Sequence, residues 1–309
     1  MTTVRPLEPR DVDQVVARIG DRLELDARIQ PLVNPTISTQ LLADALRAAA
    51  NQTWVADRDG AVVGHLYGAM LESETYGNGV WIGPDGASFE NTDTLSDLYS
   101  VAGATWIERG ALEHYVWTID DLASTQPWYE LGFARMHMRG VLRLDERRDH
   151  ALPDGYSLRR GGVEDIEIAV ALDDELDAVQ RVGPSFSIGL DHSSKRDDLM
   201  ETLEDPEVHH YVVEFGGRAV AQCVTFQLPH RRGSFEHTLH LSAVTVDAEH
   251  RHLGVGTAMV DAALGNATNA GFTYVETNWR VTNRRARNYW LGYGFEPTYV
   301  RLHRTIGLG

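Results

Sequence analysis

The sequence predicts an α/β (α+β) fold in which two similar domains follow one another. The chain has 309 residues, which suits two domains of about 150 residues each. Sequence patterns recur after about 160 residues, and each half has strand-like apolar runs followed by segments with helical periodicity. The stretch from Leu144 to Gly155 is charged and lacks apolar periodicity. We therefore expect domains at 1–148 and 149–309 with a linker where they meet.

The repeat appears at the start, in the middle and at the end of each half. Each copy pairs a strand with a helix start, then has a hairpin pattern around a Gly-containing turn, a further strand, and a Gly-Phe dipeptide before a last strand. The paired segments are Val4–Val12 with Leu158–Ile166, Thr53–Gly64 with Tyr211–Ala221, His114–Thr118 with Thr273–Thr277, and Trp128–Phe133 with Trp290–Phe295. A weak repeat of this length predicts two copies of one fold.

Composition restricts the class of protein. Hydrophobic residues make up 43% of the chain, enough for ordinary cores, without a continuous apolar run that could span a membrane. The charged first residues do not resemble a secretion signal. The single cysteine, Cys223, excludes an internal disulfide and a thiolate metal cluster, and we expect no metal. These features predict a cytoplasmic enzyme.

Charge is unevenly distributed along the chain. The formal net charge is −17, which argues against a nucleic-acid partner. From His230 to Gly309, however, nine arginines face six acidic residues. A polyanionic ligand would be attracted to this last segment.

The most specific pattern is a strand that runs through a Gly-bearing loop into a helix. A Val-rich strand ends at Asp247, and the spacing Arg251-x-x-Gly254-x-Gly256-Thr257 then opens a segment with helical periodicity. Such a helix start presents unpaired backbone N–H groups at the positive end of the helix dipole. Glycine lacks the Cβ atom that would hold a phosphate away. The pattern predicts a site for a phosphorylated ligand.

Two common phosphate loops are excluded. A Walker loop needs Gly-Lys-Ser/Thr, and the only lysine, Lys195, follows a serine. A dinucleotide fingerprint needs a third glycine in the order G-x-G-x-x-G, which this loop does not have.

The loop resembles the acyl-CoA pyrophosphate loop of the GNAT family of N-acetyltransferases. A second family signature follows the strand Tyr274–Thr277: Asn283 opens a helix, the aromatic Trp290 sits seven residues on, and Gly294-Phe295 closes the element. In that pattern the Asn caps the helix and contacts the pantetheine arm of the cofactor. Gly-Phe then leads into a final strand.

The resemblance implies two tandem GNAT-like domains, each a mixed, mostly antiparallel twisted sheet flanked by helices. The domain at 149–309 would bind acetyl-CoA (coenzyme A). The residues expected to contact the cofactor are Val244, Thr245, Val246, Arg251, His252, Leu253, Gly254, Val255, Gly256, Thr257, Asn283 and Trp290. The domain at 1–148 resembles the fold without the cofactor loop, because Pro84–Tyr99 has four acidic residues and no basic one.

Acyl transfer to an amine needs a polarised carbonyl, a base and a route for the thiolate. In the family the first role falls to backbone N–H groups, here of Val244–Val246, where the strand splays from its neighbour. His240 is the candidate base, and the alternative is a half-buried strand histidine; Glu236, His237 and Glu276 are weaker candidates. Strand alternation predicts His240, Ser242, Val244 and Val246 on one face and Leu239, Leu241, Ala243 and Thr245 on the other.

The candidate acid departs from the family pattern. Many members carry Tyr five residues before the Phe of Gly-Phe, and this chain has Trp290 there. An indole N–H cannot usefully protonate a thiolate, so we read Trp290 as a wall or sulfur contact. Tyr289 is the candidate acid, although its side chain points about 100 degrees away on a helix. A thiolate whose thiol has a pKa near 8.5 can also leave unassisted.

The resemblance thus implies an acetyltransferase that moves an acetyl group from acetyl-CoA directly to a primary amine in a ternary complex. The acceptor would be a small molecule or amino-acid-like, and a tandem arrangement also resembles mycothiol synthase. The alternative is a non-catalytic CoA-binding or ligand-sensing module. The expected partners are a small-molecule amine and neither nucleic acid nor membrane. The sequence leaves open the acyl chain and whether the chain is a monomer or a homodimer.

Overall fold

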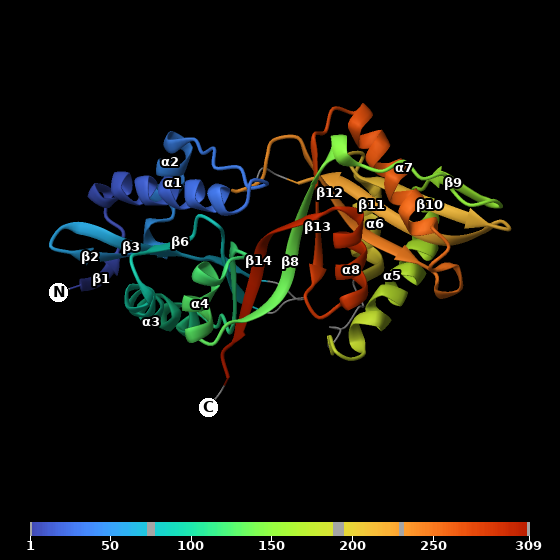
Figure 1. Cartoon of the computed structure of the whole chain (residues 1–309). Helices are drawn as coiled ribbons and strands as arrows, with labels where there is room; N and C mark the ends of the chain where they lie inside the picture. Colours follow the sequence, from blue (N-terminus) through green and yellow to red (C-terminus); the bar gives the residue numbers. More distant parts are fainter. Residues whose placement is uncertain (1, 73–77, 188–194, 229–231, 308–309) are drawn as a thin grey trace. The chain divides into compact units, whose positions relative to one another are not determined.

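The computed structural model describes residues 2–72, 78–187, 195–228 and 232–307 (Figure 1). Two compact units divide the chain. The first comprises Met1–Met138, Arg231–Ser234 and Pro297–Gly309, and the second comprises Arg139–His230 and Phe235–Glu296. Both units are discontinuous in sequence. The division into domains at 1–148 and 149–309 follows the sequence repeat and remains a proposal. It is not the same as the division into these two units.

The first unit contains an antiparallel four-stranded sheet in the order β1-β2-β3-β6. A second group of strands has the order β4-β5-β7-β14, in which β5 and β7 are parallel and the other neighbours antiparallel. The elements are β1 (Thr2–Pro6), α1 (Val12–Ile29), α2 (Thr39–Ala48), β2 (Thr53–Arg58), β3 (Ala61–Tyr67), β4 (Ala69–Leu71), β5 (Gly79–Ile82), β6 (Ala87–Phe89), α3 (Thr92–Glu108), β7 (Glu113–Ile119), α4 (Leu122–Glu130), the start of β8 (Ala134–Arg143) and nearly all of β14 (Glu296–Thr305).

Helices cover both faces of the four-stranded sheet. Apolar residues of α1, among them Val15, Ile19 and Leu23, pack with Val55 of β2 and are almost completely buried. On the other face, a Cβ at Gly64 of β3 would meet α3, so α3 approaches the strand closely there. Figure 1 shows the sheet between α1 and α3. Burial of apolar side chains stabilises such a unit by about 25 cal/mol per Å².

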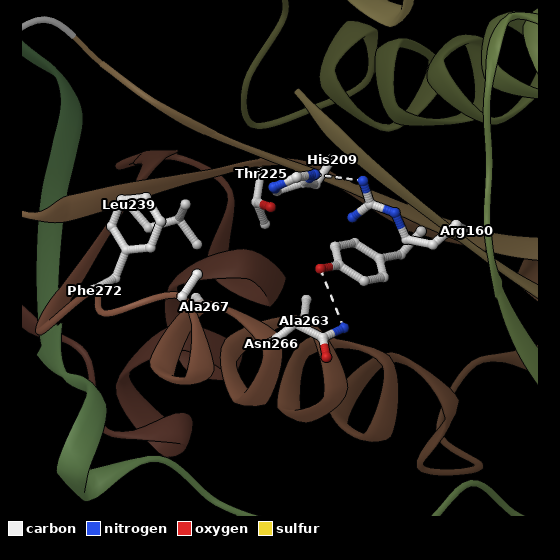
Figure 2. Close-up of a pocket in the computed structure, with 10 residues that line it drawn as sticks. Arg160, His209, Thr225, Leu239, Ala263, Asn266, Ala267 and Phe272 are labelled. Carbon is white, nitrogen blue, oxygen red and sulfur yellow. Dashed lines mark hydrogen bonds between the residues drawn. The ribbon is translucent and has the colours of Figure 1, made fainter. Parts of the chain in front are cut away.

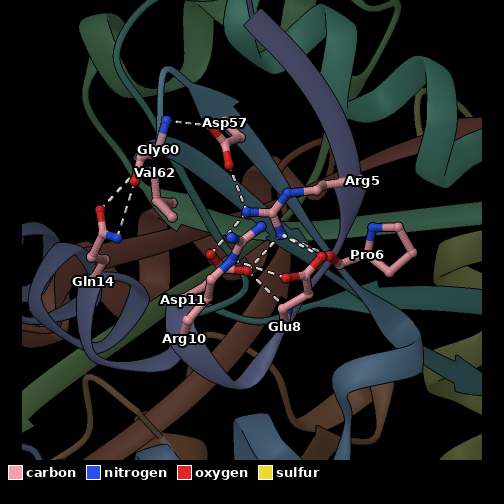
Figure 3. Close-up of polar contacts among 9 residues, drawn as sticks. All are labelled: Arg5, Pro6, Glu8, Arg10, Asp11, Gln14, Asp57, Gly60 and Val62. Carbon is pink, nitrogen blue, oxygen red and sulfur yellow. Dashed lines mark hydrogen bonds and ion pairs between the residues drawn. The ribbon is translucent and has the colours of Figure 1, made fainter.

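An ion network ties the first strand of this unit to the start of α1 (Figure 3). Arg5 of β1 donates two hydrogen bonds to the Asp11 carboxylate, at 2.6 and 2.9 Å, and one to Asp57 of β2 at 2.6 Å. Asp11 also accepts the backbone N–H of Glu8 at 2.8 Å. The hydrogen bonds from Arg5 hold the pKa of Asp11 below its usual value, so the carboxylate stays charged.

The second unit is built around a sheet in the order β13-β12-β11-β10-β9, with the later part of β8 beside β13. Strands β12 and β13 are parallel, and the pairs β12–β11, β11–β10 and β10–β9 are antiparallel. The elements are β9 (Tyr156–Arg160), α5 (Ile166–Arg181), α6 (Lys195–Glu204), β10 (His209–Phe215), β11 (Arg218–Gln227), β12 (Thr238–Val246), α7 (Val255–Asn269), β13 (Tyr274–Arg280) and α8 (Arg284–Tyr293). The predicted mixed, mostly antiparallel sheets are confirmed in both units.

The second unit repeats the ion network of the first. Arg159 of β9 donates two hydrogen bonds to Asp165, both at 2.7 Å, and one to Glu214 of β10 at 2.7 Å. Asp165 accepts the backbone N–H of Gly162 at 3.1 Å, and its pKa is lowered chiefly by Arg159. Matching side chains therefore make matching contacts at matching positions, which supports the predicted repeat.

Helices α5 and α7 cover opposite faces of this sheet. Gln222 of β11 donates to the carbonyl oxygen of Ala169 on α5 at 3.1 Å. On the other face, Tyr211 of β10 accepts a hydrogen bond from Asn266 of α7 at 3.3 Å. Tyr211 pairs with Cys223, so these two side chains share a face of the sheet. Gln222 is the neighbour of Cys223 in β11, so its side chain points to the opposite face. No helix in the described part of the chain is both long and apolar enough to cross a membrane.

Candidate functional site

Strands β12 and β13 separate in the middle of the second unit. Their parallel pairing joins Thr238, Leu239 and His240 to Tyr274, Val275 and Glu276. Both strands continue, to Val246 and Arg280, but no further residues of β12 pair with β13 in the described chain. Where they part, the Thr277 hydroxyl donates to the carbonyl oxygen of Leu241 at 2.9 Å. The opening leaves backbone groups of β12 without a strand partner on the β13 side, as the family resemblance implied for this strand.

A β-bulge in β12 changes which side chains share a face. Ala243 has a φ of 48°, and the register with β11 slips so that Ser242 pairs with Val224 but Thr245 pairs with Gln222. His240, Ser242 and Thr245 therefore share one face. The predicted alternation, which put Val246 with His240 and Thr245 opposite, is wrong beyond Ala243, because a bulge inserts one unpaired residue and reverses the alternation.

The loop after β12 ends in a helix start without a side-chain cap. A short 3-10 turn, Ala248–His250, leads to Gly254, whose φ of 87° favours glycine, and α7 begins at Val255. Gly254 offers no side chain to the first N–H groups of α7, and the first turn has no acidic residue. Those N–H groups remain available to an anion at the positive end of the dipole.

Other predicted loop residues occupy different environments. Arg251 donates to the carbonyl oxygen of Val246 at 2.7 Å and to Glu175 of α5 at 2.8 Å, so its guanidinium is held against the loop. His252 has a φ of 65°, and Leu253 is 54% exposed. Asn283 caps α8, accepting the backbone N–H of Ala286 at 3.1 Å, which confirms the predicted cap.

Buried polar atoms without partners gather around the opening. They are the Oγ1 atom of Thr245, the Oδ1 atom of Asn278 and the hydroxyl of Tyr289, none of which makes a hydrogen bond within the described residues. Native proteins rarely leave such atoms unsatisfied, because each costs about 1–3 kcal/mol. A ligand arm with amide and carbonyl groups, such as pantetheine, would satisfy them. The residues present therefore fit an acyl-CoA thioester.

Three charged or titratable side chains lie across adjacent strands beside the opening. The Nδ1 atom of His240 on β12 lies 3.4 Å from Oε1 of Glu276 on β13, and Oε2 of Glu276 lies 3.6 Å from Nη1 of Arg139 on β8. Side-chain exposure is 3% for Glu276 and 5% for Arg139. The ring of Phe226 on β11 packs on His240 with centroids 5.1 Å apart. These contacts place the buried Glu276 carboxylate next to the His240 ring.

Arg139 was not predicted, and Glu276 was only a weak candidate. Arg139 is over a hundred positions from His240 in the sequence, and no local pattern links β8 to β12. The available signal was a lone arginine in an otherwise apolar strand, Met138–Leu142. A charge in such a strand requires a buried partner.

Tyr289 and Trp290 occupy different positions on α8. Trp290 is 5% exposed and packs edge-on against Phe295, with centroids 5.0 Å apart, as part of the core. Burial raises the pKa of the Tyr289 phenol, and the nearby Thr257 hydroxyl partly offsets this rise. The Tyr289 hydroxyl makes no hydrogen bond within the described residues. Cys223 on β11, opposite the bulge, is fully buried, and burial raises its pKa to about 12. The Cys223 thiol is therefore inert at neutral pH.

The equivalent region of the first unit has a different structure. Two short strands, β5 and β6, stand where β12 is continuous, separated by residues 83–86. The N-terminus of α3 is capped by Asn91, whose side chain accepts the N–H of Thr94 at 2.9 Å, and Asp93 lies in its first turn. A capped, acidic helix start does not attract a phosphate.

Comparison with known proteins agrees with this geometry. The model of the acetyltransferase (GNAT) family matches residues 177–295. A tandem GNAT protein from the clavulanic acid biosynthesis pathway is similar over 100% of both chains, with 20% identity and a TM-score of 0.57. A GCN5-related N-acetyltransferase from Sphaerobacter thermophilus is similar over 100% of this chain and 96% of its own, with 15% identity and a TM-score of 0.61.

A GCN5-related N-acetyltransferase from Kribbella flavida covers 84% of this chain and 88% of its own, at 12% identity and a TM-score of 0.51. No curated protein sequence matches the chain. At these identities the structural likeness shows the fold, and the family model covers the segment that holds the opening between β12 and β13. Residues 177–295 therefore match the acetyltransferase (GNAT) family, and the chain as a whole has the fold of the tandem GNAT protein.

Proposed function

We propose that the second unit transfers an acetyl group from acetyl-CoA to the primary amine of a small-molecule or amino-acid-like acceptor, directly and in a ternary complex. The observation that supports this most is the opening between β12 and β13 next to an uncapped, glycine-bearing helix start. An opening beside a source of free N–H groups suits a long ligand with a pyrophosphate at one end and a thioester at the other.

Each part of the opening has a role. The N–H groups of Val255, Gly256 and Thr257 would bind the pyrophosphate, since they precede the first intrahelical hydrogen bond, from Ala258 to Gly254. Backbone N–H groups of Val244–Val246 would orient and polarise the thioester carbonyl. Acetyl-CoA, when bound, supplies an acetyl group activated as a thioester.

His240 would accept a proton from the acceptor ammonium. Glu276 faces Nδ1, which favours the tautomer with the proton on that atom and leaves Nε2 to exchange a proton with the acceptor. Arg139 balances the charge of the buried Glu276 carboxylate. His240 therefore has the support that a general base needs, a buried group that sets its orientation.

A thiol-release assay tests the proposal. The purified chain is mixed with acetyl-CoA and with a panel of amines that covers aminoglycosides, polyamines, amino acids and peptides. We expect acceptor-dependent release of free thiol and an acceptor heavier by one acetyl group in mass spectrometry. Thiol release independent of every amine would contradict direct transfer in a ternary complex.

A second function is favoured by one pair of residues. Trp290 stands where many members of the family have Tyr, and the neighbouring Tyr289 phenol is buried with a raised pKa. A module that binds CoA or senses a ligand without turnover would need no acid. Binding of CoA in calorimetry, combined with no thiol release from any amine of the panel, would favour that alternative.

A further inference from the structure

A cavity of about 240 Å³ lies in the second unit, between the sheet and the C-terminal half of α7 (Figure 2). Its walls come from β9, β10, β11 and β12 on one side and from α7 and Phe272 on the other. None of the described residues that line it belongs to the loop 247–254, to β13 or to α8. The cavity is therefore separate from the opening between β12 and β13.

Small side chains on α7 create this space. Ala263 and Ala267 face the sheet and are buried, and both line the cavity. Opposite them, Leu239 and Thr225 are each 1% exposed. A helix that presents alanines to a sheet fills less volume than one that presents leucines, so a gap remains. The floor of the cavity is mostly apolar.

The mouth of the cavity carries a positive charge. Among the described residues that line the cavity, Arg160 has the only charged side chain, and none is acidic. Its guanidinium lies over the Tyr211 ring, 4.8 Å from the centroid, and donates to Nδ1 of His209. Burial, helped by Arg160, lowers the pKa of His209, so its ring is neutral at pH 7 and accepts that hydrogen bond.

Arg160 keeps further donors for a ligand. A guanidinium has five N–H donors, and the contact with His209 uses one nitrogen of the group. Stacking on the Tyr211 ring fixes the plane of the Arg160 guanidinium. The Tyr211 hydroxyl accepts from Asn266, so its own proton is available to an acceptor oxygen. A guanidinium with a fixed plane can donate two parallel hydrogen bonds to the two oxygens of a carboxylate.

We propose that this cavity binds a small aliphatic monocarboxylate. The carboxylate would take two hydrogen bonds from Arg160, and the apolar body would lie on Leu239, Ala263 and Ala267. An amine of the same length would bring a positive charge against Arg160, so the site selects against the class of acceptor that the transfer site uses. The inference does not depend on the proposed transfer activity.

Hexanoate, 1-hexanol and hexylamine are suitable probes, because they share an apolar chain and differ in the charge of the head group. We expect saturable binding of hexanoate to the full chain in ligand-observed NMR. Hexylamine should bind at least tenfold more weakly. Arg160→Gln should weaken hexanoate at least tenfold while 1-hexanol changes little, and Ala267→Leu should remove binding of both by filling the space.

Two matched variants control for indirect effects. Ala262→Leu changes a half-buried alanine of α7 outside the lining residues, and Arg196→Gln removes an exposed arginine of α6. Both should bind hexanoate like the unmodified chain, and thermal unfolding checks that every variant is folded. Absence of saturable hexanoate binding, equal affinity in a folded Arg160→Gln variant, or displacement of hexanoate by saturating CoA would each overturn the proposal.

Discussion

The Nδ1 atom of His240 lies 3.4 Å from the Oε1 atom of Glu276, on the strand next to its own. Both side chains sit where β12 and β13 begin to part. A buried carboxylate at this distance favours the ring tautomer with the proton on Nδ1 and fixes the orientation of the ring. In the proposed mechanism Glu276 is therefore a positioning residue for a histidine base, and it touches neither substrate.

Replacement of Glu276 tests this relationship through steady-state kinetics. Glu276→Gln keeps the shape of the side chain and removes its negative charge. We expect kcat to fall at least tenfold with little change in the KM for acetyl-CoA, because the amide no longer fixes the orientation of the His240 ring. His240→Ala should lower kcat about a hundredfold, the usual contribution of a general base. A merely structural role for Glu276 would change the KM together with kcat and lower the unfolding temperature.

The control is Glu201→Gln, which removes an exposed carboxylate from α6. Its kcat and KM should match those of the unmodified chain. An unchanged kcat in both Glu276→Gln and His240→Ala would place the proton route outside this pair.

Tyr289 is a poor proton donor in this structure. Burial raises the pKa of its phenol further above that of a free thiol, which is about 8.5. Proton transfer from Tyr289 to a thiolate is therefore uphill, and the thiolate should leave unassisted. We expect Tyr289→Phe to reduce turnover less than tenfold, measured under saturating substrates. A loss of around a hundredfold would restore Tyr289 as the acid.

The repeat could be predicted from sequence because its contacts are local. Arg5 and Arg159 each lie six residues before the aspartate that they bind, so the spacing is visible in both halves. The helix cap by Asn283 was predictable for the same reason, since it joins residues three apart. Contacts between residues that are close in sequence can be recognised from the spacing of those residues.

Long-range and geometric features left no such pattern. The bulge at Ala243 depends on a left-handed backbone that alanine rarely adopts, so nothing in the sequence signalled it. The contact between Arg139 and Glu276 depends on which strand lies beside β13, which the sequence does not state. The cavity beside α7 depends on how closely a helix with small side chains approaches the sheet. Each of these is decided by tertiary packing.

The first unit should lose stability in mild acid because of His65. This histidine is fully buried, bonded to Ser88 at 2.7 Å and to the carbonyl oxygen of Asp85 at 3.0 Å, and burial lowers its pKa to about 4. The unfolded chain binds the proton near pH 6.5, whereas the folded chain does not until about pH 4. Stability is therefore complete above pH 6.5 and is lost as the pH falls toward 4.

The lost free energy of unfolding from this group is on the order of 3 kcal/mol. Urea unfolding at several pH values between 7 and 4 measures it, with His65→Gln as the comparison. The variant should depend less on pH across this range, whatever its stability at pH 7. Parallel pH dependences for the two chains would show that His65 is not responsible.

Gly254 should be needed for CoA binding because of its backbone. Its φ of 87° lies in the left-handed region, where alanine is strained by about 1–2 kcal/mol. Gly254→Ala should therefore distort the start of α7 and weaken CoA at least tenfold in calorimetry. Gly265→Ala is the matched control on the same helix, since its Cβ would lie 3.8 Å from the nearest atom of Arg147. Equal affinity in both variants would remove the loop from the cofactor site.

Each chain should bind one CoA molecule, although its two halves share a fold. The start of α7 has free N–H groups behind Gly254, whereas the start of α3 is capped by Asn91 and carries Asp93 in its first turn. Acidic side chains repel a pyrophosphate over a Debye length of roughly 8 Å at physiological salt, which covers a helix turn. Residues 83–86 also interrupt the strand that would line an opening in the first unit.

Calorimetry with CoA should therefore give a stoichiometry of one. Replacement of Asn91 by Gly and Asp93 by Asn removes the cap and the charge from α3, and so separates their effect from that of the interrupted strand. This double variant should still bind one CoA, since the interrupted strand remains, while Gly256→Val, whose side chain would press on Val246 at 3.1 Å, should bind at least tenfold more weakly. Two sites in the unmodified chain, or full affinity after both Gly254 and Gly256 are replaced by Val, would assign the cofactor to the other half.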